Sequence, residues 1–190
     1  MSSPNSRAAW PANCRGAAVL EVAPGPGYFA IELAKLGPFS ITGIDISHTF
    51  VEIASRRAAA AGVHVDFRQG NASSMPFADG SFDFLLCRAA FKNFGQPVRA
   101  LQEMCRVLKP GGRGLIVDLR RDASPESMNR AVDRMGLSAV DRVMTKLIFK
   151  LSLVKTAYTE QRFQQMLTQA AFRAVDIQGA DIGFEILMTK

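Results

Sequence analysis

The sequence predicts an α/β domain built on one mostly parallel β-sheet with helices on both faces. Up to residue 119, short apolar runs typical of buried strands alternate with stretches of helical periodicity. A glycine-rich segment separates the first strand pattern from the first helical one, and two strand patterns near the C-terminus lie close enough to form an antiparallel hairpin. Strands that alternate with helices form parallel sheets, because each crossover returns the chain to the same edge.

Five strands and three helices make up the alternating part. The strand patterns are rich in Val, Ile, Leu and Phe, and the helical patterns repeat apolar residues every three or four positions. Glycine or proline ends each helix, at Gly37-Pro38, at Gly62 and at Pro110-Gly111. We expect strands at residues 17–22, 40–46, 63–68, 82–87 and 115–119, and helices at residues 28–35, 49–61 and 97–108.

The last third of the sequence changes character. Residues 122–158 predict a largely helical insertion, whose apolar stripe is compatible with core packing, a substrate cap or a homodimer surface. A further helix is expected at residues 159–171, where Thr159 can cap the N-terminus. Strands at residues 174–177 and 184–188 complete the predicted sheet.

Length and charge limit the organisation and the partners. A chain of 190 residues fits one domain, residues 1–190, with the helical insertion inside it. The net charge of +6 is compatible with an anionic partner such as nucleic acid. The basic residues, however, occur as singles and short pairs such as Arg56-Arg57, without an aromatic-interleaved basic stripe. We therefore expect a solvated basic surface and no nucleic-acid partner.

Cysteine usage and hydropathy indicate the compartment. Cys14, Cys87 and Cys105 are widely spaced and form no C-x-x-C pair, which argues against a disulfide framework and a zinc site. With only two histidines in addition, we expect no metal site. No stretch reaches the roughly 20 apolar residues that a membrane span needs, and the N-terminal residues lack the apolar core of a secretory signal. These features predict a soluble, cytoplasmic protein without a membrane span.

The glycine-rich segment is the clearest candidate ligand site. Gly25 and Gly27 lie at a strand-to-helix junction, and neither carries a Cβ that would keep a ligand from the backbone. With Ala30 they satisfy the dinucleotide-binding pattern G-x-G-x-x-G/A. Asp45 follows about twenty residues later, at the end of the second strand. Binding of a nicotinamide cofactor is therefore one hypothesis, and a plain glycine turn with an exposed Asp45 is the alternative.

Glu21 separates the ligands that such a loop can hold. It lies at the end of the first strand beside the loop, where a negative charge opposes a pyrophosphate but suits an ammonium or sulfonium group. A carboxylate turned to solvent is the alternative. The sequence also lacks a Tyr-x-x-x-Lys pair that would support an NAD-dependent oxidoreductase. An amino-acid-bearing cofactor is therefore favoured.

Six stretches, in order, resemble one known family. Residues 19–28, around the glycine loop, are similar to motif I of class I S-adenosylmethionine-dependent methyltransferases, close to the group that includes ubiquinone and menaquinone biosynthesis methyltransferases. The other stretches lie at residues 41–47, 70–77, 81–84, 103–112 and 183–185. The resemblance runs from about residue 17 to the C-terminus. It implies a Rossmann-like seven-stranded sheet, mostly parallel with an antiparallel C-terminal edge strand.

The resemblance also implies a cofactor, S-adenosylmethionine, with S-adenosylhomocysteine as its product. In the family, the acid of the second motif, here Asp45, binds both ribose hydroxyls. The segment that starts at Gly70 meets the adenine, with Asn71 where many members have Asp. The cofactor-binding residues expected on this basis are Glu21, Ala23, Gly25, Gly27, Tyr28, Asp45, Ile46, Ser47, Asn71, Ala72, Cys87 and Arg88.

The sequence departs from the family pattern at two places. Ala23 occupies the first glycine of the usual E/D-x-G-x-G-x-G loop, a replacement that we expect to be tolerated if its φ is negative. Only about sixteen residues precede the first strand, whereas members of this type usually carry more chain there, often helices that cover the substrate. The insertion at residues 122–158 is where such families place substrate-cap elements.

The expected reaction is in-line transfer of a methyl group to a small-molecule acceptor. Because the cofactor supplies the activated methyl group, the protein mainly positions the acceptor and excludes water, and no catalytic residue is assigned. Arg88 and Lys92 follow the fourth strand and are candidates for holding an anionic acceptor, with Phe91 and Phe94 as apolar walls. Surface positions for both cations are the alternative. Tyr158 is a further candidate for the acceptor site.

Three functions remain open from the sequence. The favoured one is a small-molecule methyltransferase. A non-catalytic S-adenosylmethionine-binding or interaction protein is the first alternative, and an NAD-dependent oxidoreductase is the second. Of the two histidines, we expect His48 near the cofactor edge or in solvent, and His64 in a structural position inside a strand.

Overall fold

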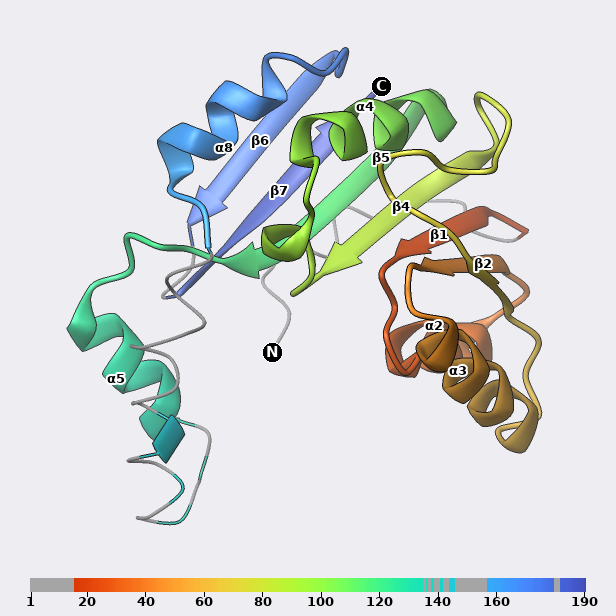
Figure 1. Ribbon diagram of the computed structural model, residues 1–190, viewed down its shortest axis with the longest axis horizontal. Coiled ribbons are helices and arrows are strands. Elements are labelled where there is room, and N and C mark those ends of the chain that lie inside the picture. The colour runs from red at the N-terminus through yellow and green to blue at the C-terminus, as the bar shows by residue number, and fades with distance from the viewer. Residues whose placement is uncertain are drawn as a thin grey trace.

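The strands of the described residues form one seven-stranded sheet. The computed structural model describes residues 16–134, 136, 138, 141, 144, 145, 157–179 and 182–190. The strands lie in the order β3-β2-β1-β4-β5-β7-β6 (Figure 1). Their bounds are Ala18–Val22 (β1), Ser40–Asp45 (β2), Asp66–Gln69 (β3), Phe82–Arg88 (β4), Leu108–Leu119 (β5), Ala174–Gly179 (β6) and Gly183–Thr189 (β7).

Strands β1 to β5 pair with one another in parallel. Strand β7 runs antiparallel to both β5 and β6, so the predicted hairpin inserts its second strand next to β5 and leaves β6 at the edge. The predicted α/β fold class is confirmed. The sheet grows from β1 toward β3 on one side and toward β4 on the other, and this reversal opens a crevice at the carboxyl ends of β1 and β4.

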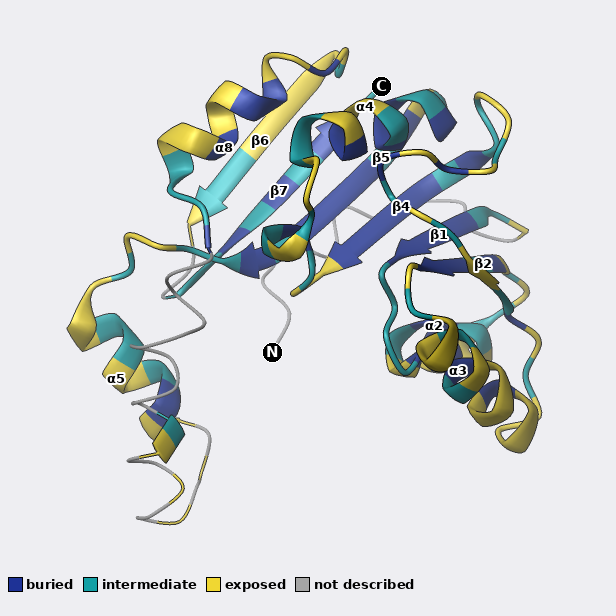
Figure 2. Ribbon diagram, in the orientation of Figure 1, coloured by how far each residue is buried: buried dark blue, intermediate teal, exposed yellow. Residues whose placement is uncertain are grey.

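Helices cover both faces of the sheet. One core cluster joins the sheet to α4 (Pro97–Val107) and α8 (Glu160–Leu167), through side chains such as Met104 and Phe163. The other cluster joins it to α2 (Tyr28–Leu36) and α3 (His48–Ala60). Figure 2 shows the buried central strands between helices whose outer faces are exposed. The apolar strands are thus buried from both sides, as a parallel sheet requires.

Two strands begin at positions that the sequence did not predict. β3 begins at Asp66 because the N–H of Val63 still donates to the carbonyl of Ala58 and completes the end of α3. His64 therefore lies before the strand and not inside it, which corrects the prediction for this residue. β5 begins at Leu108, because that residue pairs with Phe82 ahead of a shift in the register.

The predicted helical insertion is described in part. Helix α5 covers Pro125–Asp133, with Ser124 as its N-cap, and lies away from the sheet in Figure 1. Most of residues 135–156, where much of the predicted apolar stripe falls, and Cys14 lie outside the described residues. Helix α8 begins after Thr159, whose hydroxyl accepts the N–H of Arg162, so the predicted cap is confirmed. None of the described helices is long and apolar enough to cross a membrane.

Candidate functional site at the carboxyl edge of the sheet

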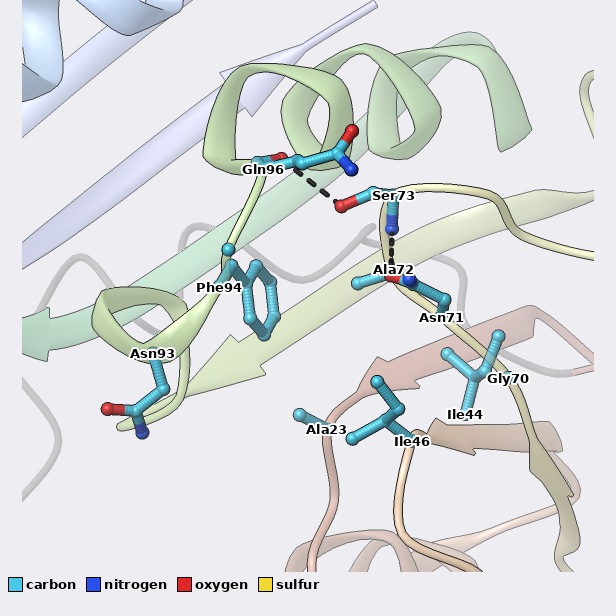
Figure 3. Close-up of a pocket in the computed structure, with 11 residues that line it drawn as sticks. Ala23, Ile44, Ile46, Gly70, Asn71, Ala72, Ser73, Asn93, Phe94 and Gln96 are labelled. Carbon is cyan, nitrogen blue, oxygen red and sulfur yellow. Dashed lines mark hydrogen bonds between the residues drawn. The ribbon is translucent and has the colours of Figure 1, made fainter.

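A cavity of about 240 Å³ lies at the crevice between β1 and β4 (Figure 3). Four segments form its walls: the end of β1, the end of β2, the start of the loop at residues 70–81, and residues 93–96, which begin at the last residue of the 3-10 helix η1 (Phe91–Asn93). Its lining residues are Ala23, Ile44, Ile46, Gly70, Asn71, Ala72, Ser73, Asn93, Phe94, Gly95 and Gln96.

The glycine loop connects β1 to α2 in a conformation that requires glycine. Gly25 and Gly27 have φ values of 53° and 78°, in the left-handed region. A Cβ on Gly27 would lie 2.8 Å from the side chains of both Ala54 and Phe67, whereas a Cβ on Gly25 would meet nothing within 4 Å. Gly27 is therefore needed for packing of α2 onto α3, and Gly25 leaves its backbone open to a ligand.

The backbone conformation of Ala23 is not the predicted one. Its φ is 55°, and not the negative value under which alanine was expected to replace the family's glycine. The N–H of Ala23 donates to the carbonyl of Ile44 at 2.8 Å, which holds the residue in this conformation. A left-handed alanine costs roughly 1–2 kcal/mol. Ala89, after β4, has φ 54°, so non-glycine residues are left-handed at both strand ends that flank the crevice.

Glu21 is buried and turned toward helix α2. Its carboxylate accepts the N–H of Ala30 at 3.0 Å, in the first turn of the helix, where the N-cap Gly27 has no side chain to do so. Burial raises the pKa of Glu21 to about 7, although the Ala30 N–H and the charge of Arg88 act to lower the pKa. The alternative of a solvent-facing carboxylate is thereby excluded.

Asp45 ties the end of β2 to the glycine loop. One carboxylate oxygen accepts the N–H of Gly25 at 3.0 Å, and the other accepts the N–H of Ser47 at 2.9 Å. The side chain of Ser47 in turn accepts the N–H of Phe50 at 3.3 Å and caps α3. A carboxylate has about four acceptor positions, so Asp45 retains capacity for the hydroxyls of a ligand.

Asn71 and Ala72, from the segment that the resemblance assigns to the adenine, meet Ile46 at the cavity. Ile46 is 70% exposed, an unusual fraction for a large apolar side chain, and it lines the cavity with Asn71 and Ala72. The side-chain oxygen of Asn71 accepts the N–H of Ser73 at 2.9 Å, which closes a tight turn in the wall. An apolar surface beside amide and backbone groups suits a heteroaromatic ring.

Four of the twelve predicted cofactor residues, Ala23, Ile46, Asn71 and Ala72, line the cavity, and the other eight do not. Cys87 is fully buried in the core, and burial raises the pKa of its thiol. Arg88 lies at the exposed end of β4, with its guanidinium carbon 5.2 Å from the centre of the Phe29 ring. Tyr28 is 65% exposed, and Arg57 lies 4.3 Å over its ring.

Lys92 has a buried partner. Its ammonium lies 3.0 Å from Asp118, and it also donates to the carbonyl of Ala89 at 2.6 Å. This pairing neutralises the charge that was expected to hold an anionic acceptor. The side chain of Lys92 is also buried, so the alternative of a surface position does not hold either. Tyr158 packs against Phe91, with ring centres 6.0 Å apart, and burial raises the pKa of its phenol.

The sequence did not assign cavity positions to Ser73, Asn93, Gly95 or Gln96. The last three flank Phe94, whose position as an apolar wall was predicted from the rule that ligands bind at the carboxyl edge of such sheets. His48 lies on the exposed surface of α3, 3.8 Å from Glu52, away from the cavity lining.

Comparison with known protein families matches a methyltransferase domain at residues 20–116, about half of the chain. The chain belongs to this methyltransferase family. The match runs from β1 to β5 and includes every residue that lines the cavity. It confirms the resemblance to class I S-adenosylmethionine-dependent methyltransferases that the six stretches indicate.

Two curated relatives match this methyltransferase-family chain over little more than half of its length. It is 39% identical over 107 residues to demethylmenaquinone methyltransferase of Deinococcus radiodurans, covering 56% of this chain and 44% of that protein. It is 41% identical over 109 residues to the uncharacterized methyltransferase YcgJ of Bacillus subtilis, covering 56% and 43%. The matched part spans less than half the length of either relative.

A solved structure extends the likeness of fold to the whole methyltransferase-family chain. A SAM-dependent methyltransferase from Methanosarcina mazei has a TM-score of 0.71 at 22% identity, and the match covers 100% of this chain and 98% of that one. The Rossmann-like arrangement with its C-terminal antiparallel pairing is therefore the fold of that enzyme as well.

Proposed function

We propose that this chain is an S-adenosylmethionine-dependent methyltransferase that acts on a small-molecule acceptor. The observation that carries the proposal is the cavity that joins Ala23 of the glycine loop with Ile46 and Asn71, while Asp45 is hydrogen-bonded to the loop beside it. The names of the relatives support the activity. Neither a NAD-dependent oxidoreductase nor a non-catalytic protein is favoured by them.

The described residues fit the parts of the cofactor. Gly25, whose missing Cβ leaves open space, lets the amino-acid end of the cofactor approach the backbone. Asp45, hydrogen-bonded to the loop, would accept the ribose hydroxyls, and Ile46 and Asn71, which line the cavity, would hold the adenine. Glu21 contributes negative potential from beneath the loop, toward an ammonium or sulfonium group.

The bound cofactor supplies the activated methyl group, so the chain's own residues position the acceptor and exclude water. Phe94 lines the cavity, and Phe91 and Tyr158 pack behind it. Such aromatic surroundings suit a planar apolar acceptor, as does the name of the demethylmenaquinone methyltransferase relative. We assign the cap to the insertion at residues 122–158, within a single domain.

Calorimetry tests the proposal on the whole chain. S-adenosylhomocysteine is expected to bind saturably and NAD not to bind. Asp45→Ala should abolish the binding, because it removes the ribose acceptor and leaves the Gly25 N–H without its partner. The control Asp66→Ala, at the start of β3, removes a carboxylate paired with Arg68 on the surface and should bind normally.

A methyl-transfer screen with demethylated quinones and smaller phenols then separates enzyme from binding protein. Transfer that requires Asp45 supports the proposal. Tight binding of S-adenosylmethionine without transfer to any acceptor would favour the non-catalytic alternative, and binding of NAD alone would overturn both.

A further inference from the structure

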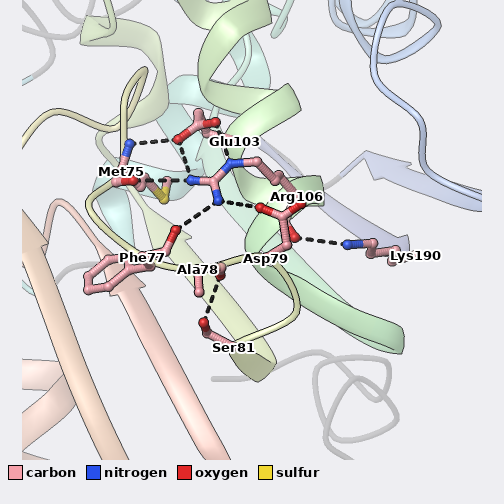
Figure 4. Close-up of polar contacts among 8 residues, drawn as sticks. All are labelled: Met75, Phe77, Ala78, Asp79, Ser81, Glu103, Arg106 and Lys190. Carbon is pink, nitrogen blue, oxygen red and sulfur yellow. Dashed lines mark hydrogen bonds and ion pairs between the residues drawn. The ribbon is translucent and has the colours of Figure 1, made fainter.

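The side chain of Arg106, in the last turn of α4, binds the loop at residues 70–81 (Figure 4). The guanidinium donates to the carbonyls of Met75 at 3.1 Å and Phe77 at 2.7 Å. It also lies 2.7 Å from the carboxylate of Asp79 and binds both carboxylate oxygens of Glu103, at 2.7 and 2.8 Å. This is a planar, bidentate arrangement that only arginine can make.

Glu103 completes the attachment from the same helix. Its carboxylate accepts the N–H of Met75 at 2.6 Å, so both backbone polar groups of Met75 are bound by α4. The side chain of Met75 is buried in the core below, which fixes this residue on three sides. The loop therefore cannot shift relative to α4 without breaking charge-assisted hydrogen bonds.

The loop residues that Arg106 binds support the cavity wall directly. Pro76 lies between the two carbonyls that the guanidinium binds, and its ring packs close to Gly70 of the wall. A Cβ on Gly70 would lie 3.5 Å from Cδ of Pro76 and 2.7 Å from Cδ1 of Ile44. The wall is thus confined between β2 on one side and the segment that Arg106 fixes on the other.

Helix α4 is attached to the same loop at its other end. The hydroxyl of Ser73 donates to the carbonyl of Gln96 at 3.2 Å, and both residues line the cavity (Figure 3). Gln96 is the residue before α4, and Arg106 lies in the last turn of that helix. The helix is therefore attached to this one loop at both ends, through Gln96 before its first turn and through Arg106 in its last turn.

We infer that Arg106, supported by Glu103, is a positioning residue for the cavity wall that receives the base of the cofactor. The inference rests on the proposed function for the identity of the ligand. Arg106 does not line the cavity, so it acts through the loop and not by contact with the ligand. Lysine, a single point charge, cannot reach two carbonyls and two carboxylates at once and should replace arginine only in part.

The test compares Arg106→Met and Arg106→Lys with Arg99→Met, which removes an exposed arginine from the same helix. Two quantities are measured: amide hydrogen exchange at residues 70–75 in the ligand-free protein, and the Kd of S-adenosylhomocysteine. For Arg106→Met we expect exchange to accelerate and the Kd to rise, each by about tenfold, the size of one lost charge-assisted hydrogen bond. The exchange rate and the Kd of Arg106→Lys should lie between those of wild type and Arg106→Met. Both quantities should be the same in Arg99→Met as in wild type.

A purely structural role would lower the unfolding temperature and leave the Kd of the folded protein unchanged. Folded Arg106→Met with wild-type exchange and wild-type Kd would overturn the inference. If that variant does not fold, Glu103→Gln, which keeps the shape and removes the charge, carries the same expectation. Failure of the wild-type chain to bind S-adenosylhomocysteine would overturn the proposed function, and the exchange measurement, which needs no ligand, still decides whether Arg106 orders the wall.

Discussion

The ammonium of Lys92 lies 3.0 Å from the carboxylate of Asp118, and only 6% and 3% of the two side chains are exposed. The same carboxylate accepts the backbone N–H of Lys92 at 2.9 Å. Asp118, near the end of β5, therefore fixes both the main chain and the side chain of the short helix η1. Phe94 follows directly after η1 and lines the cavity, so the ion pair supports this wall of the cavity.

Removing one partner of this pair should be costly, because it leaves a buried charge uncompensated. We expect Lys92→Met to lower the free energy of unfolding by about 3–5 kcal/mol. The double variant Lys92→Met/Asp118→Leu should cost less than the two single variants together. Urea denaturation of wild type, the two single variants and the double variant measures these free energies of unfolding. The more exposed pair of Lys109 and Asp83 serves as the control, since Lys109→Met should cost about 1 kcal/mol or less. Additive single effects at Lys92 and Asp118 would contradict the expectation.

The two loop glycines should respond differently to alanine. Gly27→Ala puts a Cβ 2.8 Å from Ala54 and Phe67, so we expect a lower free energy of unfolding and weaker ligand binding together. Gly25→Ala meets no atom within 4 Å and should cost roughly 1–2 kcal/mol of backbone strain, while it blocks the ligand's approach. Unfolding curves and calorimetry on both variants separate the effects. Equal losses of stability would show that the clash at Gly27 is relieved by movement of α3.

Ala23→Gly should stabilise the protein, by up to about 1 kcal/mol, because glycine adopts the left-handed conformation without strain. The same exchange at Ala59, an exposed position inside α3, should destabilise the protein by about 1 kcal/mol and is the matched control. Thermal or urea unfolding measures both. If both variants lose stability equally, Ala23 is not strained in solution.

The pKa of Glu21 makes stability depend on pH. Its value is about 7 in the folded protein and 4.5 when unperturbed, so between these values the folded state binds more protons than the unfolded state. The free energy of unfolding should therefore fall as the pH rises from about 4.5 to about 7, by on the order of 2–4 kcal/mol, and this contribution then levels off. Glu21→Gln should remove this slope. A Glu21→Gln variant with the wild-type slope would assign the pH dependence to another group.

The strands and helices of the core were predictable because each follows from local periodicity. The burial of β4 from both faces, for example, follows from the four apolar residues at positions 84–87. The start of β3 was not predictable, because it depends on how far α3 extends. The hydrogen bond from the N–H of Val63 to the carbonyl of Ala58 sets that end. Likewise, Leu108 extends β5 only because Phe82 of another strand lies opposite.

The site was predictable in its location but not in its partners. The spacing of Gly25, Gly27 and Asp45 indicated the sheet edge at which the cavity lies, because strand ends converge there. The partner of Lys92 lies 26 residues away on another strand, so no local pattern could indicate that the ammonium is neutralised. The φ of Ala23 is set by a hydrogen bond to β2, which the sequence of the loop alone does not contain.

During synthesis, β5 leaves the ribosome long before β7, the strand that pairs with it from Arg113 to Leu119. Until residues 183–189 emerge, the edge of β5 that later pairs with β7 has no partner. Ile116, which is fully buried in the complete fold, lies on this strand. Unpaired apolar edges of this kind recruit strands from other chains. A ribosome that pauses while translating residues 120–182 would therefore hold an aggregation-prone nascent chain, and protection by a chaperone should matter most in that interval.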